Sequence, residues 1–433
     1  MNQEPETKAF AAEPAWVRGK NVDERLFCQA FLKQHPMVCV GGRFFTVDGH
    51  VHDEAALMRQ VYDLLSPWVR TGLRRKAEDL VELLRVETYQ KTLPLHTDRI
   101  HVANGTLYLD GTFLPVKEYC RNRLPVRYDP DAAFPEAWIR FVSDLLEPED
   151  ILTLQEYLGY CLLPTTKAQK MLMLIGRGGE GKSRVGAVMR RIFGQNMVNG
   201  SLGKVVTNRF ARADLENKLV MVDDDMQMEG LPDTSYLKTI ITADQPLDLE
   251  RKGQQSYQGE LYARFLGFGN GSIKALYDRS YGFFRRQIIL TTKPRDPDRR
   301  DDPELAAKLT QDPEGLLYWC FCGLQRLIGQ NWQFTISERS RKNHRAAIAQ
   351  GDNIREFLSS NGYLRFHPEA EASTRALYAA YRTWCEDNAC TPLSQRSFST
   401  YLSENAETWS LRGTNNLYYL GRRIRGYIGV EVE

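Results

Sequence analysis

Apolar residues in the first part of the chain recur at the spacings of amphipathic helices and short strands. Residues 53–65 and 77–86 are apolar at positions i, i+3 and i+4, which predicts two helices. Residues 37–40 and 43–47 are short strand candidates. Within 100–114, Asn-Gly and Asp-Gly stand between alternating residues, the pattern of consecutive β-hairpins. This part of the chain is therefore expected to be α+β.

The middle of the chain alternates strand patterns with helical patterns. A turn-rich segment at 128–135 predicts a linker, and residues 136–163 predict two helices with apolar faces. Four apolar runs typical of buried strands follow, at 171–175, 219–222, 265–271 and 287–290. We therefore predict an α/β domain with a mostly parallel sheet and helices on both faces.

Residues from about 352 onward have the pattern of a separate domain. Three helices are expected, at 353–358, 374–386 and 395–403, followed by two strands around a Gly-Thr-Asn-Asn turn at 413–416. Three helices and a β-ribbon predict a winged helix. Its basic side chains, which suggest a surface that contacts DNA phosphates, are Arg412, Arg422, Arg423 and Arg425. A winged helix that docks onto protein, with solvated arginines, is the alternative.

Length and composition indicate a globular protein of several domains but do not identify a binding partner. A length of 433 residues favours two to four domains, and a net charge of +2 means that any DNA contact must come from local patches. No apolar run is as long as a membrane span, and residues 1–14 predict a polar, flexible leader, so we expect a cytoplasmic protein. The eight cysteines lack metal-finger spacing, and we expect neither zinc nor a disulfide.

The strongest chemical motif lies directly after the first of the four apolar runs. Residues 176–183 read Gly-Arg-Gly-Gly-Glu-Gly-Lys-Ser and fit G-x-x-x-x-G-K-[ST]. Glycines let backbone N–H groups turn toward phosphate oxygens, while Lys182 would reach the β- and γ-phosphates and Ser183 would bind Mg²⁺. A Gly-rich strand-to-helix turn without a ligand is the alternative. The predicted ATP-binding residues are Gly176, Arg177, Gly178, Gly179, Glu180, Gly181, Lys182, Ser183 and Arg184.

Three carboxylates follow the second apolar run, about 40 residues beyond the loop. One carboxylate at the end of a buried strand can hold Mg²⁺, and its neighbour can polarise the attacking water. The four apolar positions favour Asp223 for Mg²⁺ and Asp224 as the base, with Asp225 as a spare. An assignment that slips by one residue remains open, as does a strand that simply ends in a solvated acidic turn.

Polar residues also mark the remaining strands. The run at 265–271 contains Asn270, whose amide could orient the lytic water, and Arg285 and Arg286 precede the last run. Paired arginines bind phosphates well because of their bidentate geometry, although an ordinary surface pair is the alternative. A predicted hairpin over 246–262 carries Arg251 and Lys252 near its tip, and a solvated basic turn is the commoner explanation for such a feature. The basic cluster at 70–76 fits a helix start as well as a DNA contact.

This ordered set of motifs resembles the superfamily 3 helicases over residues 100–433. It is similar in particular to the primase–helicases of phages, plasmids and other mobile elements, whose helicase module is shared with the poxvirus primase–helicase. Two departures stand out: Glu180 replaces a frequent Asn, and Asp224 replaces a frequent Glu, which could slow hydrolysis. The first 130 residues lack a paired-acid primase signature, so a separate chain is expected to supply priming.

The resemblance implies an AAA+-like ATPase and a domain order. The expected domains are an α+β accessory domain over 1–130, a helical oligomerisation segment over 131–166, the ATPase with lid helices over 167–335 and the winged helix over 350–433. ATP and Mg²⁺ would bind between neighbouring subunits of a ring, most simply a hexamer. Arg285 or Arg286 would enter the neighbour's site as an arginine finger, while Lys252, with Arg251 beside it, would grip DNA in the channel.

The implied activity is ATP-dependent unwinding of single-stranded or forked DNA during replication of a mobile element. One alternative is a replication initiator or loader that ATP assembles on DNA, with weak or absent unwinding. A second is an ATP-regulated adaptor that acts on protein rather than on DNA.

Overall fold

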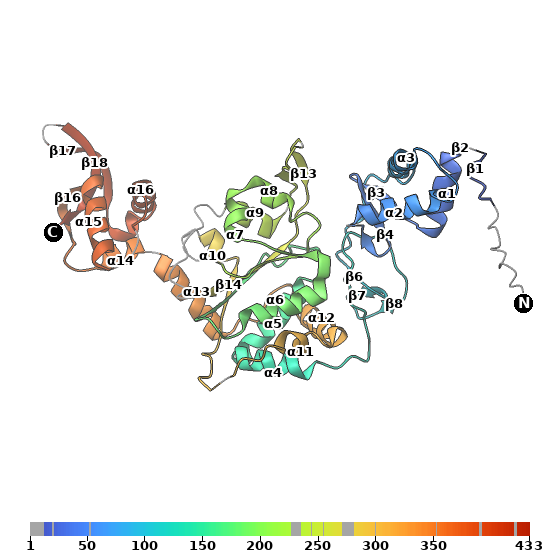
Figure 1. Cartoon of the computed structure of the whole chain (residues 1–433). Helices are drawn as coiled ribbons and strands as arrows, with labels where there is room; N and C mark the ends of the chain where they lie inside the picture. Colours follow the sequence, from blue (N-terminus) through green and yellow to red (C-terminus); the bar gives the residue numbers. More distant parts are fainter. Residues whose placement is uncertain are drawn as a thin grey trace, which may run out of the picture. The chain divides into compact units, whose positions relative to one another are not determined.

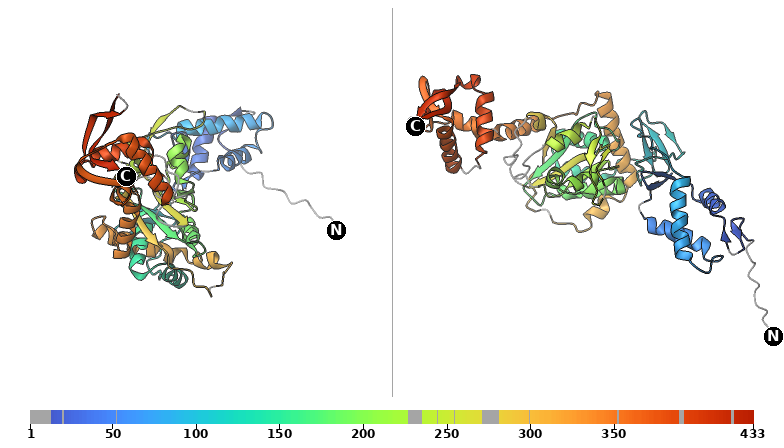
Figure 2. Two further views of the ribbon diagram at one scale, coloured as in Figure 1. Left: turned by 90° about the vertical axis from the view of Figure 1, so that its left-hand side faces the viewer. Right: turned by 90° about the horizontal axis from the view of Figure 1, so that it is seen from above.

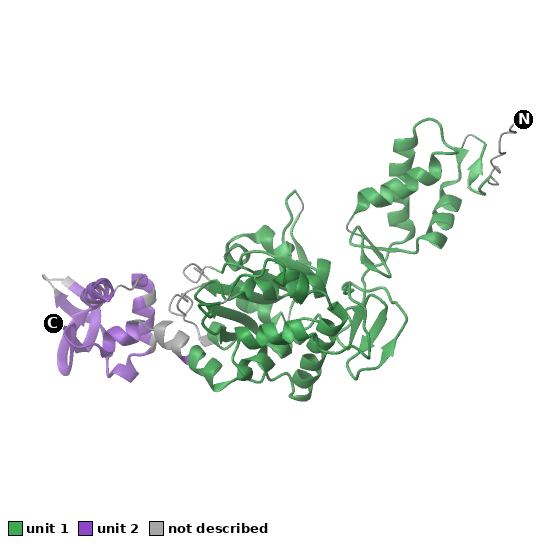
Figure 3. Cartoon of the chain, turned by 60° about the horizontal axis from the view of Figure 1, so that its bottom comes forward, with its two compact units in different colours: residues 1–272, 281–344 green, residues 273–280, 345–433 purple. Residues whose placement is uncertain are grey.

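The computed structural model describes most of the chain as two compact units. The described residues are 13–19, 21–51, 53–226, 235–243, 245–253, 255–270, 281–298, 300–351, 353–388, 392–419 and 422–433. The first unit contains the described residues up to His344 and the second those from Arg345 onward (Figure 3). Residues 1–12 of the expected leader lie outside the described residues.

The N-terminal region has its own small hydrophobic core. It consists of β1 (Val17–Arg18), β2 (Asn21–Val22), α1 (Glu24–Gln34), β3 (Val38–Val40), β4 (Arg43–Thr46), β5 (Gly49–His50), α2 (Glu54–Leu65) and α3 (Leu73–Glu87). The predicted strands and both predicted helices are therefore confirmed, and α3 extends further toward its N-terminus. The basic cluster at 70–76 includes this helix start, where Arg74 pairs with Glu78 and Lys76 pairs with Glu24.

The expected hairpins are confirmed as three antiparallel strands that join the main core. They are β6 (Arg99–Val102), β7 (Gly105–Tyr108) and β8 (Phe113–Leu114). Ile100 and Leu107 belong to the same buried cluster as Trp138 on α4 (Glu136–Leu145), so this core continues across the turn-rich segment at 128–135. The hydrophobic contacts therefore connect the hairpins with the helices that precede the central sheet.

Two long helices pack closely beside the sheet. Helix α5 (Pro148–Tyr160) contacts α12 (Pro313–Gly329), and glycines lie where the two backbones meet. A Cβ atom on Gly323 would lie 2.3 Å from the carbonyl oxygen of Gln155, and one on Gly159 would lie 2.4 Å from that of Cys320. Such distances are far below van der Waals contact, so only glycine permits this approach.

A five-stranded parallel sheet forms the centre of the first unit, with helices around it (Figures 1 and 2). Its strands are β9 (Met171–Gly176), β10 (Met197–Asn199), β11 (Val220–Asp223), β14 (Arg264–Asn270) and β15 (Gln287–Thr291). Their order is β10-β11-β14-β9-β15, and every neighbouring pair is parallel. The expected α/β architecture with a parallel sheet is confirmed.

Shorter elements complete this unit. They are α6 (Lys182–Phe193), α7 (Leu202–Thr207), α8 (Arg209–Ala213), α9 (Ser235–Thr242), α10 (Tyr281–Phe284), α11 (Leu305–Leu309) and the antiparallel hairpin of β12 (Leu247–Leu249) and β13 (Tyr257–Gly259). Helix α13 (Glu338–Gly351) carries the chain from the first unit into the second. Among the described residues, none of the helices combines the length and hydropathy needed to cross a membrane.

The second unit contains three helices and an antiparallel sheet around an aromatic core. Its elements are α14 (Asn353–Ser359), β16 (Leu364–Ser373), α15 (Thr374–Asp387), α16 (Gln395–Glu404), β17 (Arg412–Tyr419) and β18 (Arg422–Val432), with strand order β16-β18-β17. Phe357, Tyr381 and Phe398 pack in its core. The three predicted helices are confirmed, whereas β16 was not predicted from the sequence.

The predicted turn at 413–416 is wrong. These residues lie inside β17, where the register shifts between Thr414 and Leu417, and the chain reverses between Tyr419 and Arg422. The Asn416 N–H donates to Thr414 Oγ1 at 3.1 Å, which provides a local partner at the irregularity. Polar residues that resemble a turn are accommodated here as a bulge within one strand.

Candidate nucleotide-binding site

The loop between β9 and α6 has a backbone that only glycine adopts readily. Gly178, Gly179 and Gly181 have φ angles of 107°, 80° and 105°, and Gly181 is the N-cap of α6. Side chains are strained at such angles, so the three glycines give this loop its curvature. Buried β9 and α6 hold its two ends. The local context predicted for a phosphate-binding loop, a strand before it and a helix after it, is therefore present.

The side chain of Glu180 lies inside this loop. Its carboxylate accepts the N–H groups of Arg177 at 2.5 Å and Gly178 at 3.0 Å. It also pairs with the Lys182 ammonium at 2.9 Å, and the two side chains are only 3% and 6% exposed. The chain's own carboxylate thus contacts the same types of donor that a phosphate would use.

The electrostatics keep Glu180 ionised in this position. Burial by itself raises the pKa of the Glu180 carboxyl, but the hydrogen bond from Lys182 and the backbone N–H groups of Glu180 and Arg177 outweigh burial. The net pKa therefore lies below the ordinary value. A negative charge in the loop is consequently favoured at neutral pH.

The three adjacent aspartates face different surroundings. Asp223, the last residue of β11, is buried and accepts the Leu202 N–H at 2.7 Å. Burial raises its pKa, against the hydrogen bonds from the Leu202 and Asp225 backbone, while the charges of Asp225 and Asp224 raise it further. Asp223 thus holds the start of α7, whereas Asp224 and Asp225 are exposed.

A cavity of about 640 Å³ lies next to the loop and has Asp224, not Asp223, in its wall. Arg295 also lines it, donating to the Gly179 carbonyl at 3.4 Å and pairing with Asp301 at 3.0 Å. The lining residues are Gly178, Gly179, Gly181, Lys182, Ser183, Arg184, Asp224, Arg295, Asp301, Asp302, Pro303 and Leu305. Sequence reasoning missed Arg295, Asp301 and Asp302, because no motif marks them.

The other expected members of the site lie at opposite ends of the sheet. Asn270 ends β14 opposite Gly176, and its backbone is therefore at the loop end, although its side chain lies outside the described residues. Arg285 and Arg286 precede β15, whose first residue pairs with Met171 at the far end of β9. That end is about 17 Å from the loop at 3.3 Å per residue. The Arg285 side chain is exposed, and Arg286 donates to the Gly282 carbonyl.

The two adjacent cations of the basic hairpin, Arg251 and Lys252, have different surroundings. Arg251 pairs with Glu216 at 2.8 Å and donates to the Tyr257 hydroxyl at 3.1 Å, and Glu216 also pairs with Arg43 at 3.1 Å. Lys252 is exposed at the tip. The guanidinium of Arg251 therefore anchors the hairpin to the domain, and the ammonium of Lys252 faces solvent.

The four arginines predicted to contact DNA lie on the ribbon of β17 and β18, which is part of the three-stranded sheet of the second unit. Arg412 on β17 and Arg423 and Arg425 on β18 are exposed, while the side chain of Arg422 lies outside the described residues. The Arg423 guanidinium stacks over Tyr418, with its carbon 5.7 Å from the ring centre. The ribbon therefore presents cationic groups together with an exposed aromatic ring.

Two parts of the chain match family models. Residues 352–426 match the model described as poxvirus D5 protein-like, and residues 174–286 match a family of unknown function (DUF5906). The second unit is therefore similar to the poxvirus D5 protein family. No curated protein matches the chain.

Solved structures of the NrS-1 C-terminal region share the fold. The A form apo structure of this region has a TM-score of 0.50 at 12% identity and covers 93% of this chain and 98% of the other. The apo structure of residues 305–718 has a TM-score of 0.51 at 11% identity and covers 94% and 99%. This chain has the NrS-1 C-terminal fold. At such identities the likeness concerns the fold alone.

Proposed function

We propose that this protein is an ATP-dependent DNA helicase or translocase that works as a hexameric ring in the replication of a mobile genetic element. The observation that carries the proposal is the glycine loop with Lys182 and Ser183, which lines one cavity together with Asp224. Its volume of about 640 Å³ falls within the range of small-molecule sites. The match of residues 352–426 to the poxvirus D5-like model gives separate support for a replication protein.

The geometry favours Asp224 as the Mg²⁺ ligand and Asp225 as the base, one residue later in the chain than the sequence first indicated. Lys182 would contact the β- and γ-phosphates, while Ser183 and Asp224 would hold Mg²⁺, which neutralises phosphate charge. Asp225, exposed beside Asp224, would accept the proton of the attacking water. Asp223 would orient this acidic turn through its bond to Leu202. Asn270, at the end of the strand between loop and acids, would orient the water.

Arg285 and Arg286 are proposed to act on a neighbouring subunit. Both precede β15, at the far end of the sheet from the loop of their own chain. A head-to-tail ring can bring that end of one subunit to the nucleotide of the next. A guanidinium there would stabilise the charge of the transferring phosphoryl group, as an arginine finger does.

Lys252 is proposed as the DNA contact of the hairpin, with Arg251 as its support. An exposed ammonium at a hairpin tip can bind the phosphates of the DNA backbone whatever the base sequence, and such binding weakens as the salt concentration rises. We further infer that the second unit is a winged helix whose ribbon arginines contact the DNA backbone. Movement of the hairpin during ATP hydrolysis would pull the strand through the ring.

The proposal is tested by ATP turnover and by strand displacement on forked DNA. Wild-type protein is expected to do both with Mg²⁺, Lys182→Ala to do neither, and Lys204→Ala, an exposed lysine on α7, to match wild type. Wild-type turnover by Lys182→Ala would contradict the loop assignment. DNA-stimulated turnover without strand displacement would favour the ATP-assembled initiator, and turnover indifferent to DNA at low salt would favour the protein-directed adaptor.

A further inference from the structure

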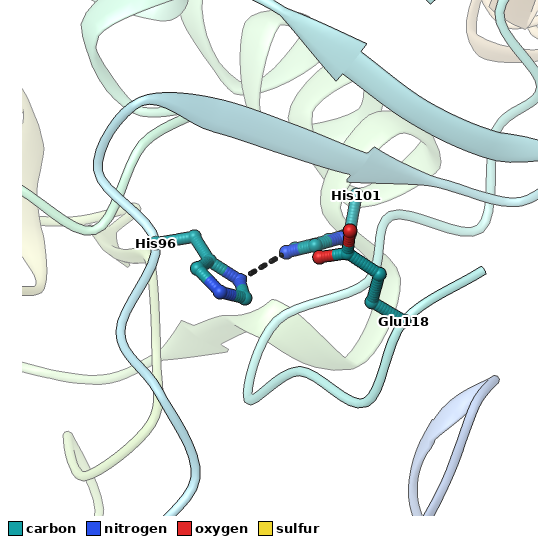
Figure 4. Close-up of side chains that lie close together, drawn as sticks. All are labelled: His96, His101 and Glu118. Carbon is teal, nitrogen blue, oxygen red and sulfur yellow. Dashed lines mark hydrogen bonds between the residues drawn. The ribbon is translucent and has the colours of Figure 1, made fainter. Parts of the chain in front are cut away.

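A cluster of three potential metal ligands lies outside the nucleotide site, among the hairpins of the first unit. His96 precedes β6, His101 is on β6, and Glu118 follows β8. Their ligand atoms all lie within 4.8 Å of one another, and Figure 4 shows the two imidazole rings and the carboxylate converging. The three residues come from one short stretch of chain, so local folding of the hairpins is sufficient to bring them together.

Hydrogen bonding selects the tautomer of His101 that can bind a metal. The Thr106 hydroxyl donates to the Val116 carbonyl at 3.0 Å, so its oxygen can only accept from His101 Nδ1, 3.5 Å away. The His101 Nε2 lone pair is therefore free of a proton and faces His96 Nδ1 at 2.8 Å. An outer partner that fixes the ring in this way is typical of metal-binding histidines.

The charge state of His101 agrees with this geometry. Burial, together with the nearby charges of Arg123, His96 and Arg99, lowers the pKa of His101 to about 3. The imidazole is therefore neutral at physiological pH, as a metal ligand must be.

Glu118 retains ligand capacity although it is paired. Both carboxylate oxygens accept from Arg99 Nη1 at 3.2 Å. Each carboxylate oxygen has two lone pairs, so one on each remains. Arg99 and Arg123 make the surroundings cationic, which opposes all divalent ions alike, so the type of ligand decides the preference. Neutral imidazole nitrogens favour zinc and similar transition metals over Mg²⁺ or Ca²⁺.

We propose that His96, His101 and Glu118 bind one divalent transition metal ion, with zinc as the first choice. A zinc–nitrogen distance of about 2.0–2.1 Å requires the rings to separate slightly from their present contact. His96 can move because it lies in the irregular segment before β6. A cavity of about 10 Å³ adjoins both imidazoles and has space for about one water as a fourth ligand. Bound metal would fasten this segment to the hairpin sheet.

This proposal departs from the expectation of no zinc, which rested on the spacing of the cysteines. None of the three ligands is a cysteine, so the two histidines, although their H-x₄-H spacing occurs in the histidine half of a zinc finger, lack the cysteine pair that would mark a finger. Glu118 joins them only because the hairpin sheet places β6 beside the segment that follows β8. The signal is therefore tertiary rather than a sequence motif.

The test is titration of the full-length, chelator-treated protein with Co²⁺, followed by visible absorption, and with Zn²⁺, followed by equilibrium dialysis. We expect one ion per chain, with cobalt bands that Zn²⁺ abolishes and that a tenfold excess of Mg²⁺ leaves unchanged. His96→Ala and Glu118→Gln should each weaken binding at least tenfold. Both residues are less buried than His101, so these variants disturb the core less.

The matched control is His367→Ala, which removes an exposed histidine of the second unit and should retain the bound ion. Circular dichroism of each variant checks that the chain is folded. Equal binding by wild type and by folded His96→Ala, or displacement of Co²⁺ by Mg²⁺ at that excess, would overturn the proposal.

Discussion

At the residue scale, the buried carboxylate of Glu180 occupies donor groups of the proposed phosphate-binding loop. Its contacts with the Arg177 and Gly178 N–H groups and with Lys182 would have to break before a phosphate could take their place. These are charge-assisted bonds, which are stronger than neutral ones. The loop therefore contains an internal competitor for the ligand that we propose for it.

Glu180→Gln should strengthen ATP binding because it removes the competing charge and keeps a carbonyl acceptor for the loop. We expect the dissociation constant to fall about tenfold, which corresponds to about 1.4 kcal/mol. Calorimetric titration measures it, with Glu304→Gln, an exposed residue outside the cavity wall, as control. Weaker binding by Glu180→Gln would mean that the carboxylate instead holds the loop in its binding shape.

Asp223 should make stability depend on pH. Its folded pKa is raised, so its contribution to the free energy of unfolding is fully present below its unfolded pKa of about 3.9. That contribution is lost as pH rises through the folded pKa. Asp223→Asn should flatten this decline, measured by urea unfolding at a series of pH values above 4, whereas Asp144→Asn, which changes an exposed aspartate on α4, should leave the decline unchanged. An unchanged slope in Asp223→Asn would assign the decline to other groups.

At the element scale, the contact between α5 and α12 depends on the absence of side chains. Gly323→Ala would place a Cβ atom 2.3 Å from the Gln155 carbonyl, and we expect a loss of about 1–3 kcal/mol in the free energy of unfolding. Gly329→Ala in the same helix meets nothing within 4 Å and is the control. Urea unfolding compares them, and equal stability of the two variants would show that the helices separate at little cost.

At the hairpin of β12 and β13, we propose that Lys252 binds DNA and that the adjacent Arg251 supports the hairpin. Lys252→Ala should uncouple ATP turnover from unwinding and lower the slope of log affinity against log salt by about one. Arg251→Ala breaks the contacts with Glu216 and Tyr257, so it should lower the free energy of unfolding by about 1–3 kcal/mol. It should leave the salt slope of DNA binding unchanged. Fluorescence anisotropy with single-stranded DNA measures both slopes. An unaltered slope and unaltered unwinding in Lys252→Ala would remove the tip from the DNA path.

At the scale of the whole molecule, the proposed site is complete only when a second subunit contributes. Comparing Arg285→Ala with Arg286→Ala should show which of the two is the arginine finger. The variant that lacks the finger should lose ATP turnover and keep nucleotide binding. Mixing it with Lys182→Ala subunits should restore part of the turnover, because some interfaces then combine an intact loop with an intact arginine. Sedimentation with ATP and forked DNA measures assembly. A monomer under every condition would contradict the ring.

The sequence by itself determined most of the elements, although it missed β16. Local periodicity was sufficient to predict the strands of the central sheet, the hairpins and the helices of the second unit, and a glycine motif predicted the loop, because these features depend on neighbouring residues. It misplaced the turn at 413–416, since a bulge and a turn use similar residues.

The tertiary structure decided which side chains meet. Asp224 rather than Asp223 lines the cavity, because Asp223 is bound by the N–H of Leu202. Arg251 is held by Glu216, and Arg295 reaches Gly179 from beyond β15. These partners are distant in the sequence, and their meeting depends on strand order and register. Residue spacing carries no information on either, so the residues that line the cavity of the proposed site could be identified only from the folded chain.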